Sequence, residues 1–195
     1  MRRHPRALLL GLCAAIATFV LFYLMTVFAL SWGTSSLGLG RTQFLQLQMF
    51  GVLFFALTIP LSAIYAGRHG THGMLIVAQA AIVLFGFVFA PLFASGATWA
   101  IALCLVFGFG VTGLTYGPLG TGLGELFPTA VRYTGTSLAF NGAGIVGASL
   151  APYLATWLER QYGLAAVGAY LSIAGLVSLL ALLGLRRAGA ARHAS

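Results

Sequence analysis

The chain has 195 residues, of which 60% are apolar and only 6% are charged. Soluble domains usually carry about 25% charged residues, so this composition excludes a cytosolic enzyme, a disordered tail and a secreted disulfide scaffold. The net charge of +8 comes from ten arginines against two acids, Glu125 and Glu159. Because the arginines are scattered between long apolar runs, we expect a membrane protein with no nucleic-acid partner.

The first expected membrane helix covers residues 7–32, a stretch of 26 residues without a charge. At 1.5 Å per residue such a helix is about 39 Å long, against a hydrocarbon core of about 30 Å. The N-terminus resembles a signal peptide, but the apolar run is roughly twice as long as a normal signal core, which favours a retained helix.

Five more apolar stretches follow, separated by turn-forming residues and nearly all of the charges. We expect helices at about 43–66, 73–94, 97–121, 134–158 and 164–185, and then a cytoplasmic tail over 186–195. Backbone groups in lipid must be satisfied internally, and the alternating pattern of a β-barrel strand is missing. The sequence therefore predicts an all-α integral membrane protein, with six transmembrane helices in a single domain over 1–195.

The arginines predict the orientation of these spans. One set of span ends holds eight arginines and the other holds two: Arg2, Arg3, Arg6, Arg68, Arg132, Arg186, Arg187 and Arg192 against Arg41 and Arg160. Arginine accumulates in cytoplasmic loops. We therefore expect a multi-pass protein of a bacterial-type inner membrane with both termini in the cytoplasm.

Neither a metal site nor an enzyme active site is expected. Cys13 and Cys104 lie inside predicted helices, where thiols usually pack as small apolar groups. His69 and His72 have the spacing of metal ligands, but no third ligand is near them in the sequence. No histidine lies at membrane depth to act as a base, and a chain without lysine has no P-loop. We therefore expect no cofactor and no enzymatic activity.

Four glycines of the fourth predicted helix share one helical face, at offsets of 0, 4, 7 and 11: Gly113, Gly117, Gly120 and Gly124. Two G-x-x-x-G steps of this kind let a neighbouring helix approach closely. Helix packing is therefore their expected role, and bending of the helix is the alternative.

The most specific stretch runs from Glu125 to Gly135 and reads E-L-F-P-T-A-V-R-Y-T-G. It resembles the loop between helices ten and eleven of major facilitator superfamily transporters. More narrowly, it is similar to the metabolite:proton symporter branch, which includes shikimate, α-ketoglutarate, citrate and proline/betaine carriers. The resemblance covers nearly the whole chain, but it corresponds only to the C-terminal half of a family member, because a complete member has twelve helices in two halves.

The resemblance implies a fold and a network of charges. One such half consists of two inverted three-helix repeats with both ends inside. In the family, the Glu and Arg of this loop belong to a network that holds the inward-closed state, a role that falls here to Glu125 and Arg132. A helix end and a positive-inside anchor are the simpler alternative. The family's D-R-x-G-R-R loop aligns with 67–72, where Arg68 matches but Gly67 replaces the Asp, so this part of the network is degraded.

The resemblance also implies a function. The intact carrier would move a small organic solute, such as an organic acid, a betaine or a shikimate-like compound, by alternating access coupled to protons. Its partners are the lipid bilayer, the solute and the protons. The polar residues expected to line this chain's wall of the substrate site are Tyr23, Thr26, Gln46, Thr115, Tyr116 and Asn141. For each of them alone, a hydrogen bond between helices is the favoured role, and only together do they indicate a polar interior surface. Proton coupling would reside in the other half, because no charged residue or histidine lies in the middle of a span here.

Three explanations of the short length remain open. We favour a truncated gene or a late start, but the chain could also pair with a separately encoded N-terminal half or form a homodimer. A different function class is a non-transporting membrane subunit or scaffold, which the degraded loop and the uncharged helix centres favour.

Overall fold

The computed structural model of the chain describes residues 5–193, and every regular element in that range is helical. The first span consists of α1 (Pro5–Tyr23), a π-helical turn η1 (Leu24–Phe28) and α2 (Ala29–Ser35). The remaining elements are α3 (Arg41–His69), α4 (Thr71–Ala94), α5 (Thr98–Gly124), the short 3-10 helix η2 (Thr129–Val131), α6 (Arg132–Tyr162) and α7 (Leu164–His193). Six of the resulting helices are long and apolar enough to cross a membrane. The prediction of an all-α protein with six membrane-length helices is confirmed.

The helices are longer than the apolar stretches from which they were predicted, and two of the turns between them are a single glycine. Gly70 joins α3 to α4 with φ +100°, and Gly163 joins α6 to α7 with φ +80°, backbone conformations that glycine adopts without a steric penalty. At the C-terminus, α7 continues to His193, where we expected a tail to begin at Arg186. The added residues are mostly alanine and arginine, which favour helix.

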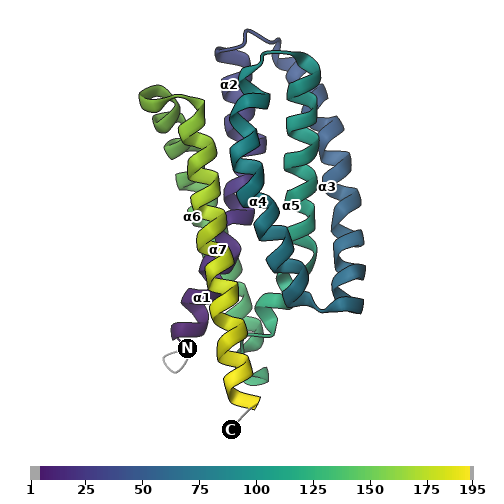
Figure 1. The fold of residues 1–195 in the computed structure, drawn as a ribbon, viewed down its shortest axis with the longest axis vertical. Helices are drawn as coiled ribbons and strands as arrows, with labels where there is room; N and C mark the ends of the chain where they lie inside the picture. Colours follow the sequence, from purple (N-terminus) through teal and green to yellow (C-terminus); the bar gives the residue numbers. More distant parts are fainter. Residues whose placement is uncertain (1–4, 194–195) are drawn as a thin grey trace.

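The six spans form an up-and-down bundle with both described ends of the chain at the same end of the molecule (Figure 1). We call this the terminal end. The most extensive contacts join α3 with α5, α4 with α7, and α1 with α6. The first three spans correspond in order to the last three: α1 to α5, α3 to α6 and α4 to α7. Under this correspondence the α1–α6 contact is equivalent to the α5–α3 contact, and the α4–α5 contact to the α7–α1 contact. This pairing pattern is that of two three-helix repeats, and the bundle is consistent with half of a major facilitator fold.

The core has different side chains at its two ends. Toward the end away from the termini, large rings fill it, including Phe28, Phe44, Phe89 and Phe93, and the rings of Phe89 and Phe93 stack at 5.3 Å. At the terminal end, small residues such as Ala14, Ala15, Ala139 and Ala143 pack with leucines.

Large apolar side chains also cover the outside of the bundle, among them Phe87 of α4 with 70% of its surface exposed. In water such a surface would be unfavourable, whereas hydrocarbon solvates it.

Candidate functional site

One face of the bundle carries a continuous cluster of aromatic rings from four spans. At its centre is Tyr116 of α5, whose ring lies 5.7 Å from that of Phe55 on α3 and 5.9 Å from that of Phe140 on α6. Phe22 of the first span extends the cluster, with its ring 5.8 Å from Phe55 and 5.5 Å from Tyr23. We call this set the aromatic face: Phe19, Phe22, Tyr23, Phe55, Tyr116 and Phe140. Tyr116 is 37% exposed, so the cluster reaches the surface of the bundle.

The other residues predicted for the substrate wall lie in different surroundings. Asn141 follows Phe140 on α6, is exposed, and donates from Nδ2 to the Ser137 carbonyl at 2.8 Å. Thr26 is half-buried and donates to the Phe22 carbonyl at 2.8 Å. Thr115 is fully buried and donates to the Thr112 carbonyl at 2.8 Å. The structure therefore places Thr115 inside the bundle, away from the surface that carries its neighbour Tyr116.

Gln46 is exposed in the second turn of α3, but the buried amide lies two residues later, at Gln48. Gln48 Nε2 donates to the carbonyl oxygens of Met25 and Thr26, at 2.7 and 2.8 Å. Both carbonyls belong to η1, the π-helical turn in which the usual helical hydrogen bonds are shifted. Gln48 therefore supplies donors to a backbone irregularity that lipid could not satisfy.

The residues Phe44, Gln48, Gly51, Phe55, Thr58 and Ser62 lie at offsets of 0, 4, 7, 11, 14 and 18 along α3, which is a single helical face. The place of Gln48 on this face is therefore visible in the sequence, but it cannot be found by considering polar residues one at a time.

Two more polar side chains reach the backbone of α1 from other helices. Ser178 of α7 donates to the Cys13 carbonyl at 2.7 Å and accepts from the Ala17 amide at 3.2 Å, so its hydroxyl is inserted into the helical ladder of α1. Gln79 of α4 is fully buried and donates to the Ala14 carbonyl at 3.1 Å. Together with the Gln48 contacts on η1, these contacts attach the first span to α3, α4 and α7 through its own peptide groups.

Glu125 and Arg132 line one pocket of about 710 Å³ at the terminal end, between the end of α5 and the start of α6. Arg132 Nε donates to the Phe127 carbonyl at 3.5 Å, and no salt bridge joins Arg132 to Glu125 in the part of the chain that the structure describes. Arg68, the third residue predicted for the charge network, is exposed in the last turn of α3 and does not line this pocket. The structure thus brings together two of the three predicted charges.

The predicted glycine face has two parts with different surroundings. A Cβ at Gly113 would collide with Thr58 and the Phe55 carbonyl, and one at Gly117 with Ser62 and the Ile59 carbonyl. At both positions α5 therefore lies directly against α3. Gly120, by contrast, has nothing within 4 Å of a Cβ position, and Gly124 has only ordinary contacts, the nearest at 3.8 Å. These last two glycines line the Glu125–Arg132 pocket.

The aromatic face offers ring stacking and amide or hydroxyl hydrogen bonds to a ligand, but no formal charge. Among residues 5–193 there is no cluster of three His, Cys, Asp or Glu side chains that could hold a metal ion.

The class of protein defined by this fold is a multi-pass membrane protein, and sequence comparison specifies it further. No protein-family model matches the chain. Over 188 residues it is 41% identical to the inner membrane metabolite transport protein YhjE of Escherichia coli, covering 94% of this chain and 43% of that protein. It is 27% identical to the shikimate transporter of Escherichia coli over 82% of this chain and 37% of that protein. It is 25% identical to the citrate-proton symporter of Klebsiella pneumoniae, over 88% of this chain and 39% of that protein.

The chain spans less than half the length of these curated relatives. Within that span it belongs to the metabolite:proton symporter family of the major facilitator superfamily, a family of transporters and not of enzymes.

Proposed function

We propose that this chain forms the C-terminal six-helix half of a proton-coupled secondary transporter for a small organic solute. The observation that carries the proposal is the aromatic face, through which Tyr116 connects α1, α3, α5 and α6 and reaches the surface of the bundle. Substrate sites in transporters of this kind lie near the bilayer midplane, at the interface of repeated units. A second six-helix unit would supply the opposite wall.

The solute class follows from the chemistry of the wall and from the relatives. Aromatic rings with the Asn141 amide nearby suit a small organic ring or chain with polar substituents, such as an organic acid, a betaine or a shikimate-like compound. The charge on an acid would then be recognised by the second unit, because the aromatic face has no cation.

Proton coupling is assigned to the second unit for the same reason. The only two acids of this chain, Glu125 and Glu159, lie at the ends of α5 and α6, outside the middle of the membrane. A proton carrier within the membrane requires a titratable group there.

Uptake into proteoliposomes tests this function. The purified chain is reconstituted alone and together with an N-terminal six-helix unit from a relative such as YhjE, and uptake of labelled shikimate, citrate and betaine is measured. We expect uptake only with both units, and a loss of at least tenfold for Tyr116→Ala, with Phe87→Ala on the outer surface as the matched control. Equal uptake by Tyr116→Ala and wild type would exclude the aromatic face as the substrate wall.

A non-transporting membrane subunit is the second candidate, and the position of both acids at helix ends favours it. That function predicts no uptake in either reconstitution, together with stable co-purification of the chain with another membrane protein.

We also propose that both termini lie in the cytoplasm of the inner membrane. The ends of α3 and α7 and the starts of α1 and α6 place Arg6, Arg68, Arg132 and the C-terminal arginines at the terminal end of the bundle. A C-terminal fusion to green fluorescent protein should fluoresce, whereas a fusion to alkaline phosphatase should be inactive. The reverse pattern would overturn this orientation.

A further inference from the structure

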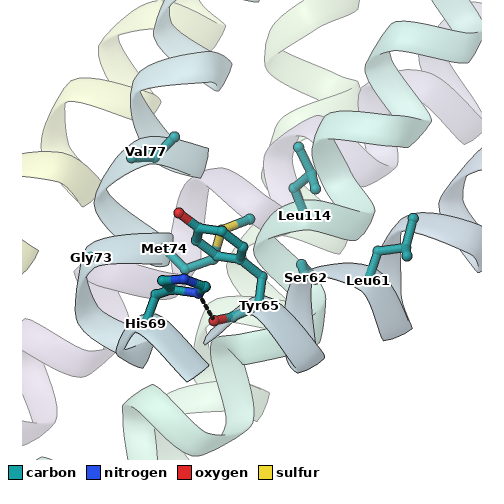
Figure 2. A pocket seen from close by; sticks show the side chains of 8 residues that line it. All are labelled: Leu61, Ser62, Tyr65, His69, Gly73, Met74, Val77 and Leu114. Carbon is teal, nitrogen blue, oxygen red and sulfur yellow. Dashed lines mark hydrogen bonds between the residues drawn. The ribbon is translucent and has the colours of Figure 1, made fainter. Parts of the chain in front are cut away.

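A lateral groove of about 540 Å³ lies at the terminal end of the bundle, on a different part of the surface from the aromatic face. Figure 2 shows it between α3 and α4, with Leu114 of α5 at its floor. Its walls are Leu61, Ser62, Tyr65 and His69 from α3 and Gly73, Met74 and Val77 from α4. The groove exists because α3 and α4 meet at Gly70 and diverge from there, each packing more extensively on α5 than on the other.

The interior of the groove is apolar and open to the side. Leu61, Tyr65 and Val77 are exposed, Val77 to 65%, so the groove faces the surroundings of the bundle. Two hydroxyls line it, those of Ser62 and Tyr65, and the Ser62 hydroxyl is already bonded to the carbonyls of Ile59 and Gly113, at 2.9 and 3.2 Å. Most of the lining side chains are apolar, which suits a hydrocarbon chain better than a polar solute.

The end of the groove near Gly70 is polar, and a positive charge, that of Arg68, lies next to its lining residue His69 in the sequence. The His69 ring stacks on the Tyr65 ring at 4.3 Å, and its Nδ1 lies 3.3 Å from the Tyr65 carbonyl (Figure 2). A carbonyl can only accept, so this hydrogen bond requires a proton on Nδ1, and Nε2 takes no part in it. Arg68 precedes His69 in the last turn of α3 and is exposed, and neither α3 nor α4 contains an acid. His72 is engaged elsewhere, with Nε2 donating to the Leu182 carbonyl of α7 at 2.9 Å.

We propose that this groove binds a bilayer phospholipid, with an acyl chain along Leu61, Met74 and Val77 and an anionic headgroup at Arg68 and His69. Tyrosine is enriched where the hydrocarbon meets the headgroups, which is the position of Tyr65 in this arrangement. Basic pockets between membrane helices bind anionic headgroups by charge complementarity. The volume of the groove lies within the range of ligand sites. The proposal holds for either orientation of the chain, because it needs only the end of the bundle to lie at headgroup depth.

Native mass spectrometry of the purified chain in detergent tests the proposal. Phosphatidylglycerol and phosphatidylcholine with identical acyl chains are titrated separately, and glycerol 3-phosphate serves as a headgroup without chains. We expect phosphatidylglycerol to bind on the order of fivefold more tightly than phosphatidylcholine, the effect of one basic residue near the membrane surface. Arg68→Gln combined with His69→Gln should equalise the two affinities.

The position of the lipid is tested by filling the groove. Val77→Trp should remove the tight phosphatidylglycerol site, whereas Leu84→Trp, at a residue of α4 that is equally exposed at 67% but outside the groove, should retain it. If Val77→Trp loses helix content by circular dichroism, Leu61→Trp on the opposite wall replaces it. Equal affinity of the two lipids for wild type, unchanged binding by the groove-filling variant, or equally tight binding of glycerol 3-phosphate would each overturn the proposal.

Discussion

The indole Nε1 of Trp32 donates a hydrogen bond to Oε1 of Glu159 at 2.9 Å, which links the first span to the fifth across 127 residues of sequence. The Trp32 ring also lies 5.3 Å from the ring of Phe93 on α4. One of the two acids of the chain is therefore engaged in a contact between helices, at the end of the bundle away from the termini. This contact holds α2 against α6 where the large rings of the core end.

Trp32→Phe tests the strength of this contact, because it removes the N–H donor and keeps a ring beside Phe93. A hydrogen bond to a charged group is worth about 1.5–3 kcal/mol, and partial exposure reduces it, so we expect the free energy of unfolding to fall by about 1–2 kcal/mol. Unfolding by dodecyl sulfate in mixed micelles measures this loss. Trp99→Phe, at an exposed position, is the control and should change little. Equal losses for the two variants would show that the Glu159 bond does not contribute.

Gln48→Leu should destabilise the first span at η1. The substitution keeps the approximate size of the side chain but removes the donor for the Met25 and Thr26 carbonyls. Leaving a buried acceptor unsatisfied costs about 1–3 kcal/mol, and the same unfolding measurement would detect it. Gln46→Leu, which changes the exposed amide two residues earlier, should have almost no effect. If both leucine variants are as stable as wild type, another donor satisfies the π-helical turn.

The two parts of the glycine face should respond differently to alanine. Gly117→Ala places a methyl group against Ser62 and the Ile59 carbonyl of α3, so the two helices must separate. Overpacking of this kind costs about 1–3 kcal/mol. Gly120→Ala has open space at the same point and removes a poor helix former, so its stability should be unchanged or higher by up to about 1 kcal/mol. Equal destabilisation by both variants would contradict the division of this face.

The helices of this protein can be predicted from the sequence more directly than the contacts between them. Charge-free stretches longer than the hydrocarbon thickness predict six helices, because lipid leaves a peptide group no partner outside its own helix. The face containing Gly113 and Gly117 was visible as a pattern, but offsets along one helix do not tell which neighbour it meets or where that neighbour ends. Gly120 shares the face but lies outside the packed region, and the sequence pattern alone does not reveal this difference.

The partners of the polar side chains that contact the backbone of the first span could not be predicted, for a related reason. Gln48, Gln79 and Ser178 come from three helices and find peptide groups 23, 65 and 165 residues away in the chain. Their sequence signal is a single polar residue in an apolar helix, which is also the signal of a substrate-lining residue. Thr115 had that signal too, and its hydroxyl is bonded within its own helix.

Glu125→Gln should slow transport in a carrier assembled from both six-helix units, with little effect on folding. Glu125 is exposed and shares a pocket with Arg132, and no salt bridge joins the two within residues 5–193. In the proposed carrier its charge would therefore be able to pair with a group of the second unit. A network that stabilises one state by about 1–2 kcal/mol changes the population of that state by about 5- to 30-fold. The initial rate of uptake should therefore fall within that range, while the thermal unfolding temperature stays within a few degrees. Glu159→Gln, at the opposite end of α6, is the matched control, because an amide oxygen still accepts the Trp32 bond. An unchanged uptake rate for Glu125→Gln would remove the network role and leave this carboxylate as an ordinary helix-end charge.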